Sequence, residues 1–249
     1  MNQAPQRYVV LGATGGVGSA LTRRLAGSGA RLVIAGRDEG RLAQLAEESG
    51  AIPRRFEATD LADVERCVHV AVERLGGVDG VVSCVGSLLL KPAHLTTMDE
   101  WSAVLATNLT SAFATVRAAA RAMMEGGGSI VLVSSAAARV GLASHEAIAA
   151  AKAGVAGLVL AAAASYASRG IRVNCVAPGL VRTPLTARLT ASAAGLKTSS
   201  DMHPLRRVGE PEEVASALAW LLDPAQSWLT GQILGIDGGL ATVRTRVSA

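Results

Sequence analysis

Short apolar runs rich in β-branched residues recur along the chain, and longer stretches typical of helices separate them. The runs that predict strands are 8–11, 31–35, 80–84, 129–134, 171–177 and 232–236. The stretches that predict helices are 17–26, 39–48, 64–75, 101–124, 145–167 and 211–222. Strands joined by crossover helices are parallel, and strands without polar alternation are buried on both faces. The pattern therefore predicts an α/β fold: a single Rossmann-type domain over residues 1–249, with a doubly wound parallel sheet covered by helices on both faces.

The composition excludes several classes of protein. Half of the 249 residues are hydrophobic and 18% are charged, so the chain can bury a full core without a disulfide or a metal. The three cysteines, Cys67, Cys84 and Cys175, are widely spaced and form no CxxC pair, which argues against a disulfide framework and against a metal site. The net charge of +4 includes no basic block, so nucleic acid is not an expected partner.

The apolar segments are too short to predict a membrane protein. The longest uncharged stretch, 153–168, falls short of the roughly 20 residues that a bilayer needs. It predicts a helix buried on nearly every side, either inside the fold or in a subunit contact. The N-terminus lacks the basic region and apolar run of a signal peptide. We therefore expect a cytoplasmic protein with no membrane partner.

A glycine-rich loop joins the first predicted strand to the first predicted helix. Its glycines let the backbone turn sharply and approach a pyrophosphate, and the amides of the helix N-terminus attract the anion. Doubly wound sheets bind ligands outside the carboxyl ends of their strands, where this loop lies. The loop therefore predicts a dinucleotide site. The residues expected to touch the dinucleotide are Gly12, Thr14, Gly16, Val17 and Gly18.

The end of the second predicted strand indicates which dinucleotide binds. A carboxylate there would bond to the ribose 2′-hydroxyl of NAD, whereas an arginine suits the 2′-phosphate of NADP. The chain reads Ala35-Gly36-Arg37, and Asp38 follows one position too late. A guanidinium can bind a phosphate through two parallel hydrogen bonds. We therefore expect NADP(H) as the cofactor in preference to NAD(H).

Further segments follow the loop in a fixed order: Asp60-Leu61, Ser83-Cys84-Val85-Gly86, Asn108-Leu109-Thr110, Pro178-Gly179-Leu180-Val181-Arg182-Thr183 and, near the C-terminus, Arg207-Val208-Gly209-Glu210-Pro211. Together with the glycine loop, they resemble the short-chain dehydrogenase/reductase family in order and spacing. Leu11 stands where the family has Thr, and residues 83–86 keep only the glycine of its Asn-Asn-Ala-Gly. The resemblance implies cofactor contacts at Asp60, Leu61, Gly86, Pro178, Gly179, Val181 and Thr183.

The resemblance also assigns catalytic positions. Family members exchange a hydride between nicotinamide and a carbonyl or alcohol. A Ser holds the substrate oxygen, a Tyr transfers its proton, and a Lys lowers the phenol pKa and binds the ribose. Ser135 matches the serine, Lys152 matches the lysine, and Asn108 matches the asparagine that helps to hold a chain of waters. The chemistry requires such groups because hydride arriving at carbon leaves an oxyanion that must be stabilised and protonated.

The position of the family tyrosine, four residues before Lys152, is occupied by Ile148, which carries no transferable proton. Three interpretations are open. His145 could supply the proton, because at 100° per residue it falls within about 20° of Lys152 on a helix, and imidazole titrates near neutrality. Alternatively, Ser135 and a water bound to Lys152 suffice for slow turnover. In the third interpretation the protein binds nucleotide and does little chemistry.

Residues 185–208 follow the nicotinamide-contacting segment and are rich in Ala, Ser and Thr. The resemblance implies that they cap the substrate, and a lid of small residues moves easily. His203, within this cap, either meets the substrate or lies in solvent. The cap lacks an arginine cluster that would select a charged substrate. A neutral, fairly apolar ketone or alcohol is therefore expected.

These observations predict an NADP(H)-dependent carbonyl reductase or alcohol dehydrogenase of the short-chain type that lacks the tyrosine acid. Its partner is a small carbonyl or alcohol substrate. The apolar helices around 103–124 and 153–167 resemble those that pair in dimers and tetramers of the family, so a homo-oligomer is expected. The alternative is a catalytically weak or inactive nucleotide-binding protein with a regulatory or structural role.

Overall fold

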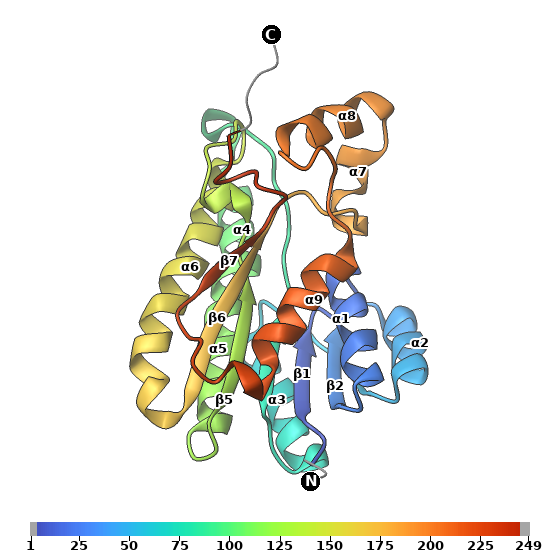
Figure 1. The fold of residues 1–249 in the computed structure, drawn as a ribbon, viewed down its shortest axis with the longest axis vertical. Coiled ribbons are helices and arrows are strands. Elements are labelled where there is room, and N and C mark those ends of the chain that lie inside the picture. Colours follow the sequence, from blue (N-terminus) through green and yellow to red (C-terminus); the bar gives the residue numbers. More distant parts are fainter. Residues whose placement is uncertain (1–3, 245–249) are drawn as a thin grey trace.

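The computed structural model describes residues 4–244 (Figure 1). Its strands are β1 (Arg7–Leu11), β2 (Arg31–Gly36), β3 (Ile52–Arg55), β4 (Gly80–Ser83), β5 (Gly128–Val133), β6 (Ile171–Pro178) and β7 (Ile233–Ile236). Its α-helices are α1 (Gly16–Gly27), α2 (Glu39–Ser49), α3 (Leu61–Leu75), α4 (Met98–Leu105), α5 (Ser111–Met123), α6 (Glu146–Tyr166), α7 (Ala187–Thr190), α8 (Ala193–Met202) and α9 (Pro211–Leu222). The ends of the predicted domain, residues 1–3 and 245–249, lie outside the described range.

The strands form one parallel sheet in the order β3-β2-β1-β4-β5-β6-β7. β1 and β4 are neighbours at its centre, with Leu11 paired to Ser83. From these two strands the chain winds outward in opposite directions. Their carboxyl ends therefore mark the topological switch point at which doubly wound sheets open a ligand crevice. The predicted α/β fold is confirmed.

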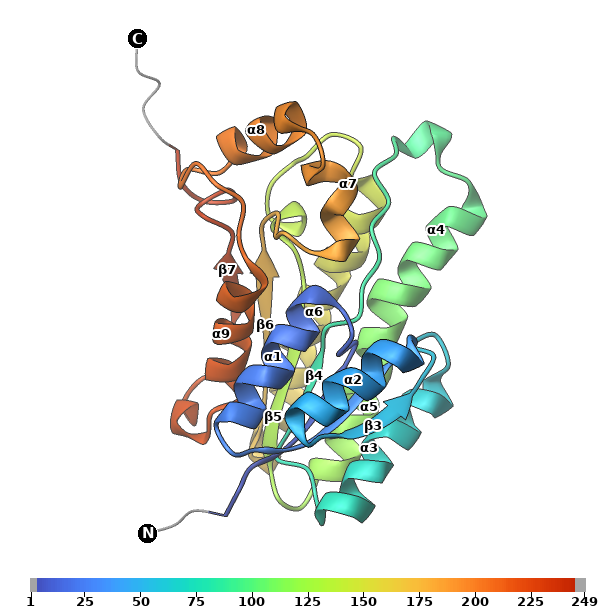
Figure 2. The same ribbon diagram turned by 90° about the vertical axis from the view of Figure 1, so that its right-hand side faces the viewer.

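Helices cover both faces of the sheet, with α3, α5 and α6 on one side and α1, α2 and α9 on the other (Figures 1 and 2). Successive strand residues point to opposite faces. Val9 and Leu11 of β1 therefore join the core beneath the first set of helices, and Tyr8 and Val10 join the core beneath the second. The cap helices α7 and α8 lie beyond the carboxyl ends of the strands (Figure 1).

The structure corrects two local predictions. The apolar pattern did not mark β3, because its sequence Ile-Pro-Arg-Arg is largely polar. Among the strands of residues 4–244, this one pairs with β2 alone, and an edge position tolerates the proline. The helix predicted over 101–124 is present but not regular throughout, because a π-helical turn, Ala106–Thr110, lies between α4 and α5 within one continuous helical run. Such turns are frequent at functional sites, and this one contains Asn108.

By length and composition, the segment Glu146–Arg169, which contains α6, could cross a membrane. In the structure, α6 packs on β5 and β6. A core helix of a soluble protein can be equally long and apolar. Only 44% of the most apolar window is buried within the chain. The prediction that this helix is buried on nearly every side is therefore wrong for a single chain. Its uncovered side includes Leu160, which is 53% exposed.

Candidate active site

The glycine loop turns tightly between β1 and α1. Gly12 has a φ of +76°, and a Cβ on it would lie 2.9 Å from the carbonyl carbon of Cys84. A Cβ on Gly18 would collide with the carbonyl oxygen of Gly12 and lie 2.9 Å from Cα of Ala13. Both positions require glycine, because the loop backbone touches itself and the segment after β4. The loop thus makes the sharp turn that the sequence predicted, and its contact with a pyrophosphate stays a prediction.

The N-terminus of α1 lies open beside this loop. No side chain caps it at Gly15, so the first amides of the helix are free to bind an anion. Thr14 and Val17 are half-buried on either side. Thr183, from the turn after β6, reaches this point, since a Cβ on Gly16 would lie 2.8 Å from its Cγ2. The structure therefore joins the predicted phosphate loop to the predicted nicotinamide segment.

The end of β2 packs closely against the Thr14 side chain. A Cβ on Gly36 would lie 2.8 Å from the hydroxyl oxygen of Thr14. Arg37 follows, exposed, and pairs with no carboxylate of residues 4–244. Asp38 caps α2 by accepting a hydrogen bond from the Arg41 amide at 3.0 Å. The end of β2 thus presents glycine followed by an exposed guanidinium, and the predicted preference for NADP(H) stays a prediction.

Asp60 lies at the N-terminus of α3, where it has two protein partners. Its Oδ1 accepts the Ala62 amide at 2.9 Å, and its Oδ2 pairs with Arg66 at 3.3 Å. Leu61 begins the helix and packs against the core. The capping bond is itself a sufficient reason for an aspartate here. The predicted adenine contact of Asp60 and Leu61 stays a prediction.

Asn108 is buried and clamps the segment after β4. Its Oδ1 accepts the Ser87 amide at 3.2 Å, and its Nδ2 donates to the Ser87 hydroxyl at 2.9 Å and to the Val104 carbonyl at 3.0 Å. Gly86 lies between the two site side chains. A Cβ on it would be 3.3 Å from Oδ1 of Asn108 and 3.7 Å from Nζ of Lys152. The amide side chain of Asn108 thus uses both donor hydrogens and one acceptor site of its oxygen to position this segment.

Lys152 is buried, at 6% exposure, and its Nζ donates to the Val133 carbonyl at 2.9 Å. Within residues 4–244 it has no carboxylate partner. Burial lowers the pKa of Lys152 to about 8. The pKa of the neighbouring thiols of Cys84 and Cys175 is raised by burial to about 12, so neither supplies a counterion near neutrality. A buried ammonium without a counterion is destabilising, as expected of a group kept for a ligand.

Ser135 directly follows the strand end that holds Lys152. Its Oγ accepts the Ala137 amide at 3.1 Å, and the side chain is half-buried. The preceding Ser134 donates its hydroxyl to the backbone carbonyl of Lys152 at 2.8 Å. Three consecutive residues at the end of β5 therefore set the positions of the ammonium and of the Ser135 hydroxyl.

Ile148 is buried in an apolar cluster. Its side chain fills the position where the resemblance predicts a phenol. It is 3% exposed and packs with the neighbouring small residues of α6 and with Val104. Half-buried apolar side chains close the cluster: Leu88, Leu89, Trp101, Leu105 and Leu109. No proton donor can therefore act from this position.

His145 lies one residue outside α6, at its N-cap, with φ −110° and ψ 12°. Residues rotate by 100° about the axis only within a helix, and His145 has a non-helical backbone conformation. The predicted alignment of His145 with Lys152 on one helix face therefore does not apply. Its Nδ1 lies 2.7 Å from the Ala143 carbonyl, which leaves Nε2 free. No hydrogen bond among the described residues joins it to Ser135 or Lys152. Its role in proton transfer stays a prediction.

The turn after β6 contains Pro178, Gly179 and Val181, and it connects to β7 and the cap. Gly179 donates its amide to the Ile236 carbonyl at 3.1 Å. His203 contradicts the expectation of a histidine in solvent, because it is 3% exposed and accepts the Leu180 amide at 3.2 Å. Its ring lines a cavity, and contact with a substrate stays a prediction.

Two contributors to the site were not predicted from the sequence. They are Ser87, which bonds to Asn108, and His203, which accepts the Leu180 amide. Ser87 directly follows the matched glycine Gly86, and a hydroxyl there was a detectable signal. His203 had no detectable signal, since its partner Leu180 is 23 residues away along the chain. Only the fold brings the two together.

The chain is similar to known proteins along nearly its whole length. A family model described as enoyl-(acyl carrier protein) reductase matches residues 12–241. The chain is 39% identical over 241 residues to the cis-4-hydroxycyclohexanecarboxylate dehydrogenase of Sinomonas cyclohexanicum, covering 94% of this chain and 96% of that protein. It is 35% identical over 240 residues to the 3-oxoacyl-(acyl-carrier-protein) reductase of Thermotoga maritima, covering 93% and 96% of the two chains.

Solved structures give the same result. A short-chain type dehydrogenase/reductase of Mycobacterium ulcerans superposes with a TM-score of 0.90 at 31% identity, covering 97% of this chain and 91% of that one. A variant of actinorhodin polyketide ketoreductase, solved with NADPH, gives a TM-score of 0.90 at 30% identity, covering 96% and 98%. The chain belongs to the short-chain dehydrogenase/reductase family of oxidoreductases.

Proposed function

We propose that this protein is an NADP(H)-dependent oxidoreductase that reduces a ketone or aldehyde, or oxidises the corresponding secondary alcohol. The observation that carries the proposal is the buried ammonium of Lys152, which has a backbone carbonyl as its partner and no counterion among the described residues. Maintaining such a charge lowers stability, and a ligand with hydroxyl or anionic oxygens would offset that loss. The ketoreductase solved with NADPH is a structural neighbour in support.

The residues of this chain fit a nicotinamide dinucleotide. Gly12, Gly16 and Gly18 leave the loop bare for a pyrophosphate, and the uncapped start of α1 offers its amides. Arg37 would bind the 2′-phosphate. The preceding residue, Gly36, has no side chain that could block this contact. Further contacts are proposed for Thr14, Val17, Asp60, Leu61, Gly86, Lys152, Pro178, Gly179, Val181 and Thr183. When bound, the nicotinamide supplies or accepts the hydride.

The side chains of the site would manage the charge that develops on the substrate oxygen. Ser135 would donate its hydroxyl hydrogen to that oxygen, because among residues 4–244 its Oγ accepts the Ala137 amide and donates to no partner. Lys152 would stabilise the negative charge, and Asn108 would keep the segment after β4 in place. His145 is the proposed proton donor, through the ring nitrogen Nε2 that is free of the Ala143 carbonyl.

The proposed substrate is a neutral, apolar carbonyl compound or alcohol. The half-buried residues Leu88 and Leu89 around the buried Ile148 support this choice, since they offer no charge to a ligand. We also propose a homo-oligomer, because α5 and α6 expose Phe113 and Leu160 at 49% and 53%. Neither nucleic acid nor a membrane is a proposed partner, and the proposed location is the cytoplasm.

The proposal is tested by following NADPH oxidation at about 340 nm with a panel of ketones. We expect saturable turnover that falls about a hundredfold in Ser135→Ala, because a donor to the developing oxyanion is lost. Ser165→Ala is the matched control. Its hydroxyl lies on the same helix as Lys152 but bonds only to the Ala161 carbonyl, and it should leave turnover unchanged. Equal rates in both variants would contradict the assignment of Ser135.

A second candidate function is nucleotide binding without catalysis. The burial of Ile148 among apolar side chains favours it, because the position that serves the family as acid holds none. Tight NADPH binding without turnover of any ketone or alcohol in the panel would select this candidate. Absence of binding to NADPH and NADH would reject both.

A further inference from the structure

His203 ends the cap and is packed against the turn after β6. It follows α8 directly, and both ring nitrogens have partners. Nε2 lies 3.2 Å from the amide nitrogen of Leu180, and Nδ1 lies 2.7 Å from the carbonyl oxygen of Ser199. A Cβ on Gly179 would come within 2.6 Å of Nε2. The imidazole therefore joins the cap to the turn at direct contact distance.

The two hydrogen bonds determine the protonation state of the ring. A backbone amide only donates and a carbonyl only accepts, so Nε2 must hold a lone pair and Nδ1 must hold the hydrogen. This arrangement requires neutral imidazole. A second proton, on Nε2, would set two donors against each other. It would also leave the Leu180 amide without an acceptor beside a buried ring, which is unfavourable.

We propose that His203 is a positioning residue of the cofactor site: its neutral ring holds the turn at residues 179–180 in place, and its protonation releases that turn and weakens dinucleotide binding. The inference rests on the proposed function, which places residues 178–183 beside the nicotinamide. His203 touches no reacting group and acts through Leu180. The structure thus contains a histidine whose charge state is linked to cofactor affinity.

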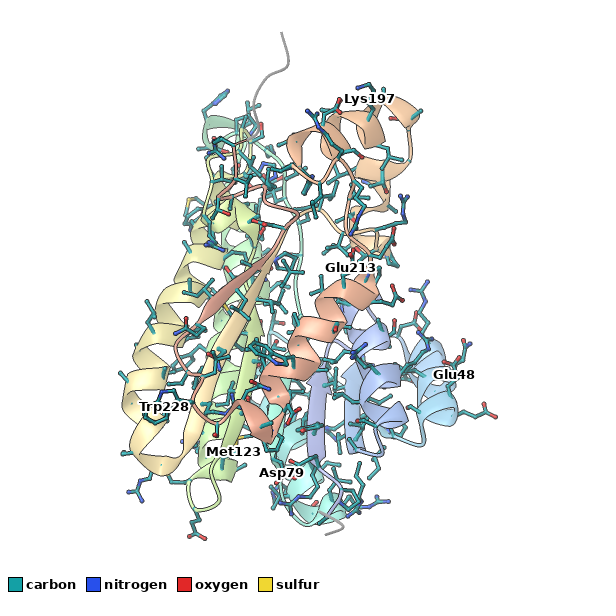
Figure 3. The ribbon with its side chains drawn as sticks, viewed as in Figure 1. Glu48, Asp79, Met123, Lys197, Glu213 and Trp228 are labelled. Atoms are coloured by element: carbon teal, nitrogen blue, oxygen red, sulfur yellow. The ribbon has the colours of Figure 1, made fainter. Side chains whose placement is uncertain are left out.

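The charged groups around the ring already have partners. Asp237, at the end of β7, accepts two backbone amides of the turn that follows it. Arg207 and Glu213 pair at 2.6 Å on the wall of a cavity of about 380 Å³ that the imidazole also lines. On α8, Asp201 pairs with Lys197 at 2.6 Å. Figure 3 shows Lys197 on α8 and Glu213 at the start of α9. Within residues 4–244 no carboxylate bonds to the ring, so none stabilises an added proton directly.

Two substitutions separate the hydrogen bond from simple filling of space. His203→Gln offers an amide oxygen that can accept the Leu180 amide and does not titrate. His203→Leu fills the buried volume and accepts nothing. His69→Leu is the control, because this histidine of α3 is exposed and pairs only with Glu73 at 3.1 Å. NADPH affinity is measured by fluorescence titration from about pH 8 to about pH 5.5, the range in which histidines change charge.

At the upper pH we expect His203→Gln to bind NADPH within about twofold of the unmodified protein, and His203→Leu to bind about tenfold more weakly. On acidification, the unmodified protein and His69→Leu should each lose about tenfold more affinity than His203→Gln, which keeps only the loss that protonation of the NADPH 2′-phosphate causes. An identical pH dependence in His203→Gln would overturn the proposal. So would His203→Leu binding as tightly as the unmodified protein.

Hydrogen exchange of the Leu180 amide in the cofactor-free protein gives an independent readout. We expect slow exchange in the unmodified protein and in His203→Gln, and exchange at least about tenfold faster in His203→Leu. If the unmodified protein binds no NADPH at the upper pH, the proposed function fails, and the exchange rates still decide whether the hydrogen bond exists. If it binds NADPH but the three exchange rates agree, only the role of His203 is rejected.

Discussion

The glycine loop and the start of α6 meet at the same edge of the sheet, yet they are specified in different ways. At Gly12, Gly18 and Gly36 a single added carbon would strike the backbone or the Thr14 side chain. At Ile148 the chain has an apolar side chain where the resemblance predicts a phenol. This isoleucine is buried in an apolar cluster, and the helix α6 that holds it is regular. Backbone contacts therefore fix the dinucleotide half of the molecule, whereas the catalytic half depends on side chains that can be exchanged without changing the fold.

The largest effect is expected from Gly18→Ala in the dinucleotide half. The new methyl would overlap the Gly12 carbonyl, which cannot move without opening the loop, so NADPH affinity should fall by about a thousandfold or more. Gly27→Ala is the matched control. Gly27 lies on the same helix as Gly18, and a Cβ on it would have no neighbouring atom within 4 Å. Fluorescence titration measures both. Retained affinity in Gly18→Ala would contradict the argument from backbone contact.

Lys152→Met should lower kcat by about a hundredfold or more while raising stability at neutral pH. The pKa of this lysine falls from 10.5 in the unfolded chain to about 8 in the folded protein, because burial disfavours the ammonium. The unfolded chain binds more protons between these values, so stability rises with pH across that window. The variant should gain about 3 kcal/mol in free energy of unfolding at pH 7.

Urea unfolding of Lys152→Met and of the unmodified protein at a series of pH values measures this gain. The difference between the two proteins should shrink as the pH rises from about 8 to about 10.5, because the folded protein then no longer holds the charge. A constant difference across that window would show that lost packing, and not desolvation, sets the stability of the variant.

His145→Ala tests whether the catalytic half has replaced its acid. A missing general acid lowers the rate by about a hundredfold, and the fall in rate on the alkaline side of the pH profile should vanish with it. His94→Ala is the control, since this histidine lies in a separate short turn at residues 93–95. Steady-state rates across pH decide the matter. An unchanged profile would assign proton delivery to water bound at Lys152.

Ile148→Tyr sharpens the comparison by introducing the phenol that the resemblance predicts at this position. The larger ring must enter a buried cluster, so we expect a loss of about 1–3 kcal/mol in stability. If the phenol reaches the site, turnover should rise about tenfold or more. Ile148→Phe is the control, with the same ring and no hydroxyl. Equal turnover in the two variants would mean that the pocket has been rebuilt around isoleucine.

The smallest effect is expected from Arg37→Ala. Loss of one exposed phosphate contact should weaken NADPH binding about tenfold and leave NADH binding unchanged. Arg41→Ala is the control, because that guanidinium already pairs with Asp38 at 3.4 Å. Parallel titrations with both dinucleotides measure the ratio. An equal loss for NADH and NADPH would place Arg37 away from the 2′-phosphate.

The parts of the molecule that the sequence predicted are those governed by local rules. The strand and helix pattern, the glycine loop and the spacing of Ser135 and Lys152 can all be read along the chain. The pattern missed β3, because an edge strand does not need apolar residues. It also missed the π-helical turn around Asn108 and the bond from Leu180 to His203. Those features depend on segments that become neighbours only when the chain has folded.

One consequence follows from the way β5 ends. Val133 holds the ammonium of Lys152 through its carbonyl, Ser134 bonds to the backbone of that lysine, and Ser135 presents the hydroxyl. A displacement of this strand tip would carry both groups along together and preserve the spacing between them. Ile148 lies one helical turn before Lys152 on α6, so its backbone would move with the same strand tip.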